Sequence, residues 1–153
     1  MSSPTPRDIA ETFIRYGLGK ADAAVFDALT AADIVVETGL SPVEPIRGRD
    51  AYKAVFMEFA ASWPVRDLTI HRIDVAGDTV MVEFTATAEF ARDYYGVAAT
   101  HQLVPMREIH RLDMSDARIV RSVVAAVNLP FEFIMYPALK DAVLGPLQSV
   151  AKA

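Results

Sequence analysis

The sequence predicts an α+β fold in which a curved, mostly antiparallel sheet wraps around N-terminal helices and leaves a conical cavity between the two layers. Three observations lead to this expectation. Apolar residues recur at helical spacing before Pro64 and at strand spacing after it. Helices and strands are therefore segregated along the chain, as in antiparallel α+β domains. Hydrophobic residues make up 52% of the 153 residues, which suffices for one packed domain with a surplus for a cavity or a subunit interface.

The first helix is expected to begin after Thr5. Thr5 can cap it, and Pro6 suits its first helical position. Ile9, Phe13 and Tyr16 then fall on one stripe of this helix.

A short helix, a strand and a longer helix are expected next. Asp22 can cap the short helix, "DIVVETGL" is strand-like, and "SPVEPIRG" is a loop. The longer helix begins near Asp50 and stops at Pro64. It presents four aromatic side chains at helical spacing, namely Tyr52, Phe56, Phe59 and Trp63.

Four alternating segments after Pro64 predict a meander of four strands. They span residues 67–75, 79–90, 100–114 and 118–128. The apolar segment "LPFEFIMYPALKDAVLGPL" follows; its prolines break it, and it is expected to form a short helix or a lid. We therefore expect one domain over residues 1–153, with residues 130–153 as a C-terminal lid or tail.

Composition excludes several classes of function. The net charge of −5 argues against non-specific nucleic-acid binding, which needs a basic face. The chain has no cysteine, so disulfides, thiol catalysis and zinc–thiolate sites are excluded. No apolar run resembles a signal peptide or approaches the roughly 20 residues of a membrane span. We expect a cytoplasmic protein that binds neither nucleic acid nor membrane.

Alternation along the long strands predicts which side chains face the cavity. One face of the strand over 79–90 is apolar throughout and should point inward; it carries Val80, Val82, Phe84, Ala86, Ala88 and Phe90. On the strand over 100–114, Arg107 and Arg111 favour the outer face. The inward set is then Gln102, Val104, Met106, Glu108, His110 and Leu112.

Glu108 and His110 carry the main catalytic hypothesis. On a strand without a bulge they point the same way, about 6.5–7 Å apart. A carboxyl on an apolar wall is expected to have a raised pKa, and a neighbouring imidazole can move a proton near neutral pH. Two other interpretations stay open: the two side chains satisfy each other in the core, or a one-residue bulge turns both to solvent.

Asn128 is expected at the end of the last strand. It shares a face with four residues, Val120, Ser122, Val124 and Ala126. Its amide can hold a carbonyl or a water, or it can cap the segment that follows. The histidines predict no metal site, because His101 and His110 point to opposite faces of one strand and His71 lies on another. No metal or other cofactor is expected.

Three stretches carry a family resemblance: "ALTAADIVVETGLSPVEPIRGRDAYKAVF", "VAGDTVMVEFTATAEF" and "HRLDMSDARIVRS". The order of elements resembles the nuclear transport factor 2-like superfamily, which includes ketosteroid isomerase, SnoaL-type polyketide cyclases, limonene epoxide hydrolase and scytalone dehydratase. The resemblance implies a cystatin-like, ketosteroid isomerase-like cone. It also implies an apolar ligand in the cone and, commonly, a cytosolic dimer. Some members are not enzymes.

The catalytic positions of ketosteroid isomerase are not reproduced. Its proton-abstracting aspartate corresponds to Thr38, with Glu37 beside it; if Thr38 faces the cavity, Glu37 faces out, and a slip of one residue reverses this. Its oxyanion-binding tyrosine corresponds to a position near Ile14, with Tyr16 nearby. Its neutral aspartic acid falls near Glu108.

The other two sets of catalytic residues are also incomplete. The Arg–Asp pair of the epoxide hydrolase corresponds to Phe84 and Ala86. The SnoaL-type aspartate falls near Val127 or Asn128, and the His–Trp pair before it is replaced by Ser122-Val123.

The leading hypothesis is a SnoaL-like protein that binds a small apolar molecule. As an enzyme it would be a cofactor-free isomerase, cyclase or dehydratase that transfers protons. His110 would act as base, Glu108 as neutral donor or orienter, and Asn128 or Tyr16 as carbonyl partner. The ligand is expected to contact Thr38, Phe56, Trp63, Phe84, Ala86, Val104, Met106 and Val124. The alternatives are a non-catalytic ligand-binding or dimeric interaction domain and, more weakly, an epoxide hydrolase.

A homodimer is expected through the outer face of the sheet. That face carries the apolar residues Leu103, Ile109 and Val123, which are more than a monomer needs to expose.

Overall fold

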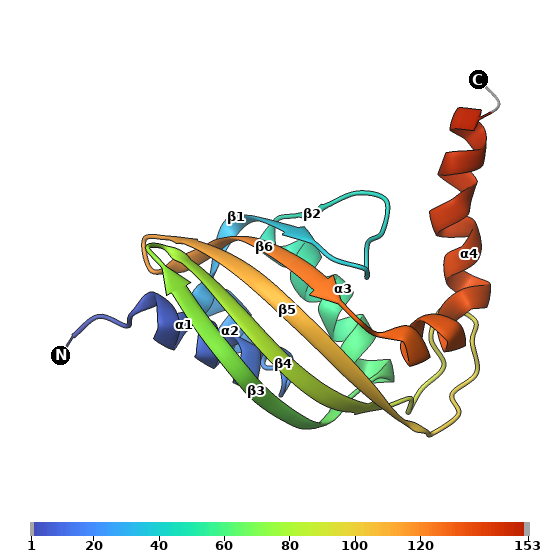
Figure 1. The fold of residues 1–153 in the computed structure, drawn as a ribbon, viewed down its shortest axis with the longest axis horizontal. Coiled ribbons are helices and arrows are strands. Elements are labelled where there is room, and N and C mark those ends of the chain that lie inside the picture. Colours follow the sequence, from blue (N-terminus) through green and yellow to red (C-terminus); the bar gives the residue numbers. More distant parts are fainter. Residues whose placement is uncertain (1, 152–153) are drawn as a thin grey trace.

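The computed structural model describes residues 2–151 and has the predicted α+β architecture (Figure 1). Within these residues, six strands form one curved sheet in the order β2-β1-β6-β5-β4-β3, and the helices that precede β3 lie on one of its faces. Neighbouring strands are antiparallel except for β1 and β6, which are parallel. The elements are α1 (Pro6–Thr12), the π-helix η1 (Phe13–Leu18), α2 (Ala23–Leu29), β1 (Thr30–Glu37), β2 (Ile46–Arg47), α3 (Arg49–Ser62), β3 (Val65–Ala76), β4 (Thr79–Glu89), β5 (Leu103–Ser115), β6 (Arg118–Ala126) and α4 (Leu129–Ala151).

The start of α1 is the predicted one. The amide of Asp8 donates to the Thr5 hydroxyl at 3.2 Å, and the Thr5 amide donates to the Asp8 carboxylate at 2.9 Å. This reciprocal cap satisfies two donors that the helix itself leaves free. Pro6 occupies the first turn, where its missing N–H matters least.

The expected stripe of Ile9, Phe13 and Tyr16 is wrong for its last member. The helix widens into η1, where the amide of Gly19 donates to the Ile14 carbonyl five residues earlier. A wider turn changes which residues face the sheet. Ile14 is fully buried, whereas Tyr16 is 51% exposed.

Helix α3 is fixed at both ends. The Gly48 amide donates to the Ile34 carbonyl at 2.8 Å, with φ of 94°, a conformation that favours glycine. Pro64 follows the last turn, as predicted. Tyr52 and Phe56 point into the core from this helix, and the buried Trp63 after it stacks on Phe90 with ring centroids 4.2 Å apart.

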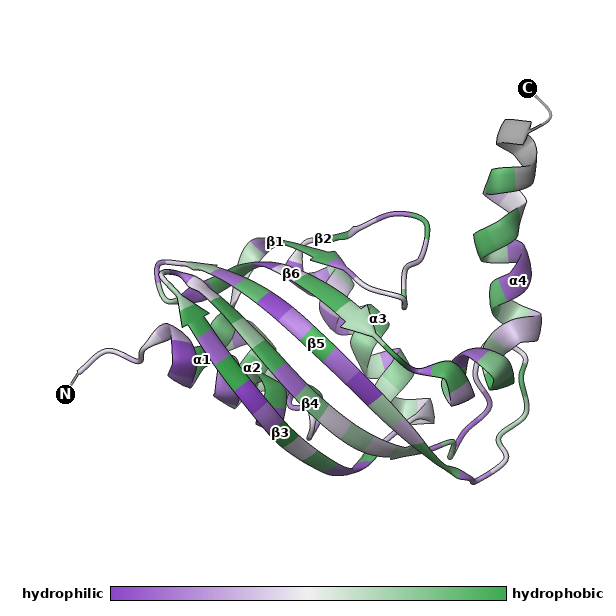
Figure 2. Cartoon of the chain, viewed as in Figure 1, coloured by the Kyte–Doolittle hydropathy of each residue, from purple (hydrophilic) through white to green (hydrophobic). Residues whose placement is uncertain are grey.

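The predicted inner faces of β4 and β5 are confirmed, except that Gln102 precedes β5 and is exposed. Figure 2 shows polar and apolar residues alternating along both strands. The inward residues of β4 are buried, and so are Val104, Met106, His110 and Leu112 of β5. Pairing between the two strands runs without a bulge from Thr79 to Glu89. Glu108 and His110 therefore lie on the same face, as expected for an unbroken strand.

The predicted inward face of β6 is wrong at the start of the strand, where it is displaced by one residue. The pairing of β5 with β6 shifts between Asp113 and Met114, which face Arg121 and Ile119. Val120 is the extra residue of this bulge, so Ile119 takes its place in the core. From Ser122 onward the expected face is restored.

The C-terminal segment forms a longer helix than predicted. Helix α4 contains Pro137 and Pro146, so the prolines do not end it. A proline inside a helix removes one backbone hydrogen bond and bends the helix. Figure 1 shows α4 changing direction after its first turns and then standing away from the body. Residues 152–153 of the expected tail lie outside the described residues. Across residues 2–151, no helix is long and apolar enough to cross a membrane.

Candidate active site

A cavity of about 380 Å³ lies between the sheet, α3 and the start of α4. Seven of the eight residues expected to contact a ligand line it: Thr38, Phe56, Trp63, Phe84, Ala86, Met106 and Val124. Most of the remaining lining is also apolar, and it includes Leu18, Phe59, Leu68 and Phe131. The wall is therefore suited to a ligand that is largely apolar.

Val104 is the one expected ligand contact that the cavity does not reach. It is buried in a separate cluster that contains Trp63, Phe90 and Met135. Met135 comes from α4, so this helix, which is longer than predicted, takes part in the cluster that encloses Val104.

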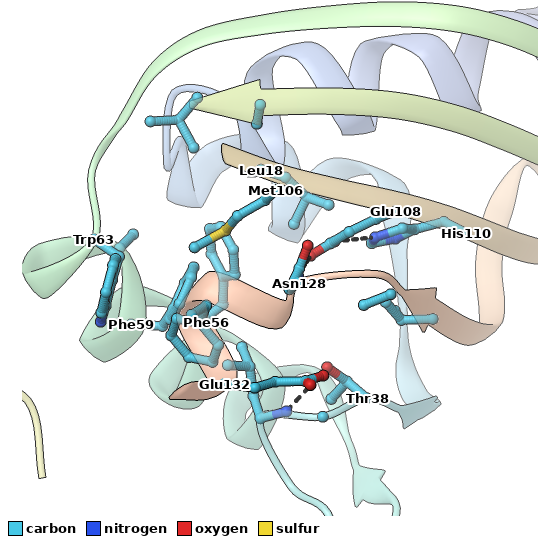
Figure 3. Close-up of a pocket in the computed structure, with 18 of the residues that line it drawn as sticks. Leu18, Thr38, Phe56, Phe59, Trp63, Met106, Glu108, His110, Asn128 and Glu132 are labelled. Carbon is cyan, nitrogen blue, oxygen red and sulfur yellow. Dashed lines mark hydrogen bonds and ion pairs between the residues drawn. The ribbon is translucent and has the colours of Figure 1, made fainter. Parts of the chain in front are cut away.

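Three polar side chains meet at one end of the cavity (Figure 3). The ring nitrogen Nε2 of His110 lies 2.8 Å from Oε1 of Glu108, and Nδ2 of Asn128 donates to Oε2 of Glu108 at 2.8 Å. Each carboxylate oxygen therefore has one protein partner. Since a carboxylate oxygen has two lone-pair positions, each oxygen keeps one for a ligand.

Asn128 is held by the backbone of β5 as well. Its Oδ1 accepts a hydrogen bond from the Arg107 amide at 2.8 Å. Both ends of the side-chain amide are thus engaged with β5, so the side chain serves the site rather than capping α4. The sequence placed Asn128 at the end of the last strand, and the structure joins it directly to Glu108.

The expectation of a raised pKa for Glu108 is wrong. Burial does raise the pKa of this carboxyl, but hydrogen bonds from His110 and Asn128 and the charge of His110 outweigh burial. The net result is a pKa below the ordinary 4.5. Glu108 is therefore a carboxylate at neutral pH, and Nε2 of His110 must carry the proton of their hydrogen bond.

His110 has little contact with the cavity space. Its side chain is 4% exposed, against 21% for Glu108. The other ring nitrogen, Nδ1, is buried and has no hydrogen-bond partner within residues 2–151. The ring packs against Phe84, with centroids 5.1 Å apart. Glu108 is thus the member of the pair that is more accessible to a ligand.

Tyr52 is a polar group of the site that the sequence analysis treated as part of an aromatic stripe. It lines the cavity and is only 3% exposed, yet its hydroxyl makes no hydrogen bond to the part of the chain that is described. Burial raises the pKa of Tyr52, and the negative charge of Glu108 raises it further. Tyr52 therefore stays protonated, close to the carboxylate. Its place among Phe56, Phe59 and Trp63 gave no sign of a polar role.

Two other expected positions lie apart from this group. Tyr16 is not among the residues that line the cavity, because the π-helix turns it to solvent. Thr38 lines the cavity, whereas Glu37 pairs with Arg121 at 2.8 Å on the other side of the sheet. This is the arrangement expected if Thr38 faces in.

The histidines are dispersed. Nε2 of His71 lies 2.8 Å from the Thr85 hydroxyl, and His101 lies 3.8 Å from Glu89. Across residues 2–151, no three side chains of the metal-binding types come together. The residues around the cavity provide hydrogen bonds and apolar contacts, and no set of side chains typical of a metal centre.

Solved structures with this fold come from several bacteria. A candidate SnoaL-like polyketide cyclase from Jannaschia sp. CCS1 is 18% identical, with a TM-score of 0.72 over 86% of this chain and 93% of that one. IdmH, a candidate polyketide cyclase from Streptomyces antibioticus, is 23% identical, with a TM-score of 0.69 over 82% and 94%. A candidate polyketide cyclase from Acidithiobacillus ferrooxidans is 20% identical, with a TM-score of 0.70 over 93% and 99%. At these identities the likeness shows the fold.

The sequence itself supports the family assignment. No curated protein matches it. The sequence model of the SnoaL-like domain family matches residues 10–122, which is most of the chain and includes α3, β4 and β5. The predicted resemblance is therefore confirmed, and the chain belongs to the SnoaL-like family.

Proposed function

We propose that the protein is a cofactor-free enzyme that isomerises, cyclises or dehydrates a small apolar compound by proton transfer. One observation carries the proposal: an ionised carboxylate, Glu108, stands at the polar end of an apolar cavity and is held there by two donors. A fixed base in a cavity with little water is what removal of a proton next to a carbonyl requires. The resemblance to candidate polyketide cyclases supports the same class of chemistry.

The roles proposed for Glu108 and His110 are the reverse of those expected from the sequence. Glu108 is ionised and accessible, so it acts as the base. His110 donates through Nε2, and its Nδ1 is sealed from the cavity. His110 and Asn128 therefore position the carboxylate and set its basicity.

The proton-transfer step can be written in full. A lone pair of Glu108 takes a proton from the carbon next to the substrate carbonyl, and the electrons of that C–H bond form the C=C bond of an enolate. The hydroxyl of Tyr52 donates a hydrogen bond to the oxygen that gains the charge. Protonated Glu108 then returns the proton to another carbon of the conjugated enolate, which completes an isomerisation. Alternatively, the enolate carbon attacks a second carbonyl and closes a ring; the π electrons of that C=O bond move to its oxygen, which takes the proton from Glu108.

Deuterium exchange tests this step without knowledge of the product. We would incubate the protein with enones, cyclic ketones, polyketide mimics and epoxides in deuterated water and follow the compounds by mass spectrometry. Glu108 should place deuterium next to a carbonyl, and Glu108→Gln should not. If the wild type binds some compounds but neither exchanges nor converts any, the non-catalytic ligand-binding domain is the better explanation. Opening of an epoxide without exchange would favour the hydrolase alternative.

We also propose that the protein forms a homodimer through the outer face of the sheet. Leu103 is 62% exposed and Ile109 39% exposed on that face, although Val123 is partly covered. Burial of these side chains against a second copy would remove them from water. Sedimentation of wild type and Ile109→Lys at micromolar concentration checks this: the wild type should be dimeric and the variant should dissociate more readily.

A further inference from the structure

The charged groups around the cavity are of one sign. The lining includes two glutamates, Glu108 and Glu132, and no lysine or arginine. His110 is the one basic side chain of the lining, and it is engaged by Glu108. A negatively charged ligand would therefore meet two carboxylates and no cation other than His110, which Glu108 already engages.

Glu132 lies one helical turn after Asn128 in the chain. Its amide donates to the Asn128 carbonyl at 2.9 Å, so the two residues share a face of α4. Figure 3 shows Asn128 beside Glu108, and Glu132 on the side of the cavity where Thr38 lies. Glu132 is exposed, and its carboxylate forms no ion pair with the described residues. It is thus a free negative charge at the mouth.

The cavity wall next to Glu132 is aromatic. Phe131 packs edge-on against Phe59 with ring centroids 5.8 Å apart, and both line the cavity. Aromatic faces attract cations because their π-electrons carry negative charge. The mouth therefore combines a carboxylate with two rings, which is a suitable setting for an ammonium group.

Deeper in the cavity, Tyr52 points to a ligand independently of these charges. This side chain is 3% exposed and lines the cavity, but its hydroxyl lacks a hydrogen-bond partner within residues 2–151. This hydroxyl is not one of the fully buried polar atoms without a partner, so it is free to bind a polar atom of a ligand in the cavity. The ligand is expected to offer a polar atom at the inner end as well as at the mouth.

We infer that the ligand is an apolar ring compound with a protonated amine, and that Glu132 selects it by receiving the ammonium group at the mouth. The inference names the substrate class of the proposed enzyme, and it rests on the same cavity. Its inner end presents a neutral oxygen to the hydroxyl of Tyr52, and its ring occupies the aromatic middle. Carboxylate analogues of the same shape are rejected.

A matched series of ligands tests the selection by charge. The probes are para-tert-butylbenzylamine, the matching benzyl alcohol and the matching benzoate, which share a shape and differ in charge. Trp63 is the single tryptophan of the chain and lines the cavity, so its fluorescence reports occupancy. We expect the amine to bind at least about tenfold more tightly than the benzoate, with the alcohol between them.

The variant Glu132→Gln should lower the amine-to-benzoate ratio several-fold. Glu11→Gln is the control, because it changes net charge equally but removes a surface partner of Arg15 on α1. Equal affinity for amine and benzoate in the wild type would overturn the inference. An equal drop of the amine-to-benzoate ratio in both variants would also overturn it. The preference would then come from the net charge of the protein and not from a contact between Glu132 and the amine. If none of the three probes alters Trp63 fluorescence, the inference fails as well.

This readout is separate from catalysis. A protein that prefers the amine but neither exchanges nor converts any compound overturns the proposed enzyme and leaves the charge selection standing. A protein that exchanges protons of neutral ketones but binds amine and benzoate equally overturns the charge selection and leaves the proposed enzyme standing.

Discussion

The two faces of β5 carry charge pairs of similar geometry in different surroundings. On the outer face, Arg107 donates to Glu83 at 2.6 Å, and the two side chains are 55% and 25% exposed. On the inner face, His110 and Glu108 are 2.8 Å apart and are 4% and 21% exposed. Arg107 and Glu108 are adjacent in sequence, so the alternation of a strand alone separates the two settings.

The difference shows that the surroundings, more than the pair, determine what a carboxylate can do. The two carboxylates are similarly exposed, but the partner of the outer one, Arg107, is solvated, and such surface pairs stabilise a protein by about 0–1 kcal/mol. The partners of the inner carboxylate, His110 and Asn128, are both buried, so its two hydrogen bonds are shielded from water and fix its orientation. Only the inner one is fixed beside a cavity that can hold a substrate.

The first way to test this comparison is to remove each carboxylate charge in turn. Glu108→Gln should reduce turnover or deuterium exchange by about a hundredfold or more, because it removes the proposed base while keeping its shape. Glu83→Gln removes the outer charge and should leave the rate unchanged. Rates measured on any compound that the wild type exchanges decide the point; equal rates in the two variants would place the chemistry elsewhere.

A second test removes the donors. His110→Ala leaves the buried carboxylate of Glu108 without one partner, which should cost about 2–3 kcal/mol in free energy of unfolding. Arg107→Ala breaks the outer pair and should cost less than about 1 kcal/mol. Urea unfolding of both variants measures the difference. Similar costs would mean that the inner pair is no better shielded than the outer one.

A third test compares the two faces of β4. Ala86 lines the cavity and pairs with Met106, whereas its neighbour Thr87 points to the other side. Ala86→Trp should fill the cavity and weaken binding of para-tert-butylbenzylamine by at least about tenfold. Thr87→Trp should bind it normally. Calorimetry suits this comparison, since both variants add a second tryptophan; unchanged binding by Ala86→Trp would refute the cavity assignment.

The sequence predicted those parts of the fold that depend on local pattern. The alternation of β4 and β5, the caps at Thr5 and Asp22 and the stop at Pro64 are all observed. Each depends on residues close together in the chain, whose geometry follows from the backbone. The common face of Glu108 and His110 could be predicted for the same reason.

The features that the sequence did not reveal are local shifts of one residue or depend on contacts between distant segments. The π-turn that exposes Tyr16 and the bulge at Val120 are single-residue shifts, and no residue pattern marks them. The pKa of Glu108 was predicted with the wrong sign because the hydrogen bond and charge of His110, and then the hydrogen bond from Asn128 twenty residues away, outweigh burial. Burial alone was visible from the strand pattern, and the hydrogen bonds that outweigh it were not.

The smallest expected effect concerns pH. The pKa of Glu108 is lowered in the folded protein, so the unfolded chain binds its proton first as the pH falls. The ionised carboxylate therefore contributes its full stability above about pH 4.5, the ordinary pKa of the group. This stability is lost as the pH falls through the lower pKa that Glu108 has in the folded protein. The difference in unfolding free energy between wild type and Glu108→Gln should shrink over that range, whereas the small difference for Glu83→Gln should change little.

Urea unfolding of the three proteins between neutral pH and the acid range measures these differences. A gap for Glu108→Gln that stays constant down to the acid limit would show that hydrogen bonding to the neutral acid, rather than to the carboxylate, holds the inner pair. A gap that widens as the pH falls would mean that burial raises the pKa after all. Either result would return Glu108 to the role of a neutral donor and would require another base for the proton transfer proposed above.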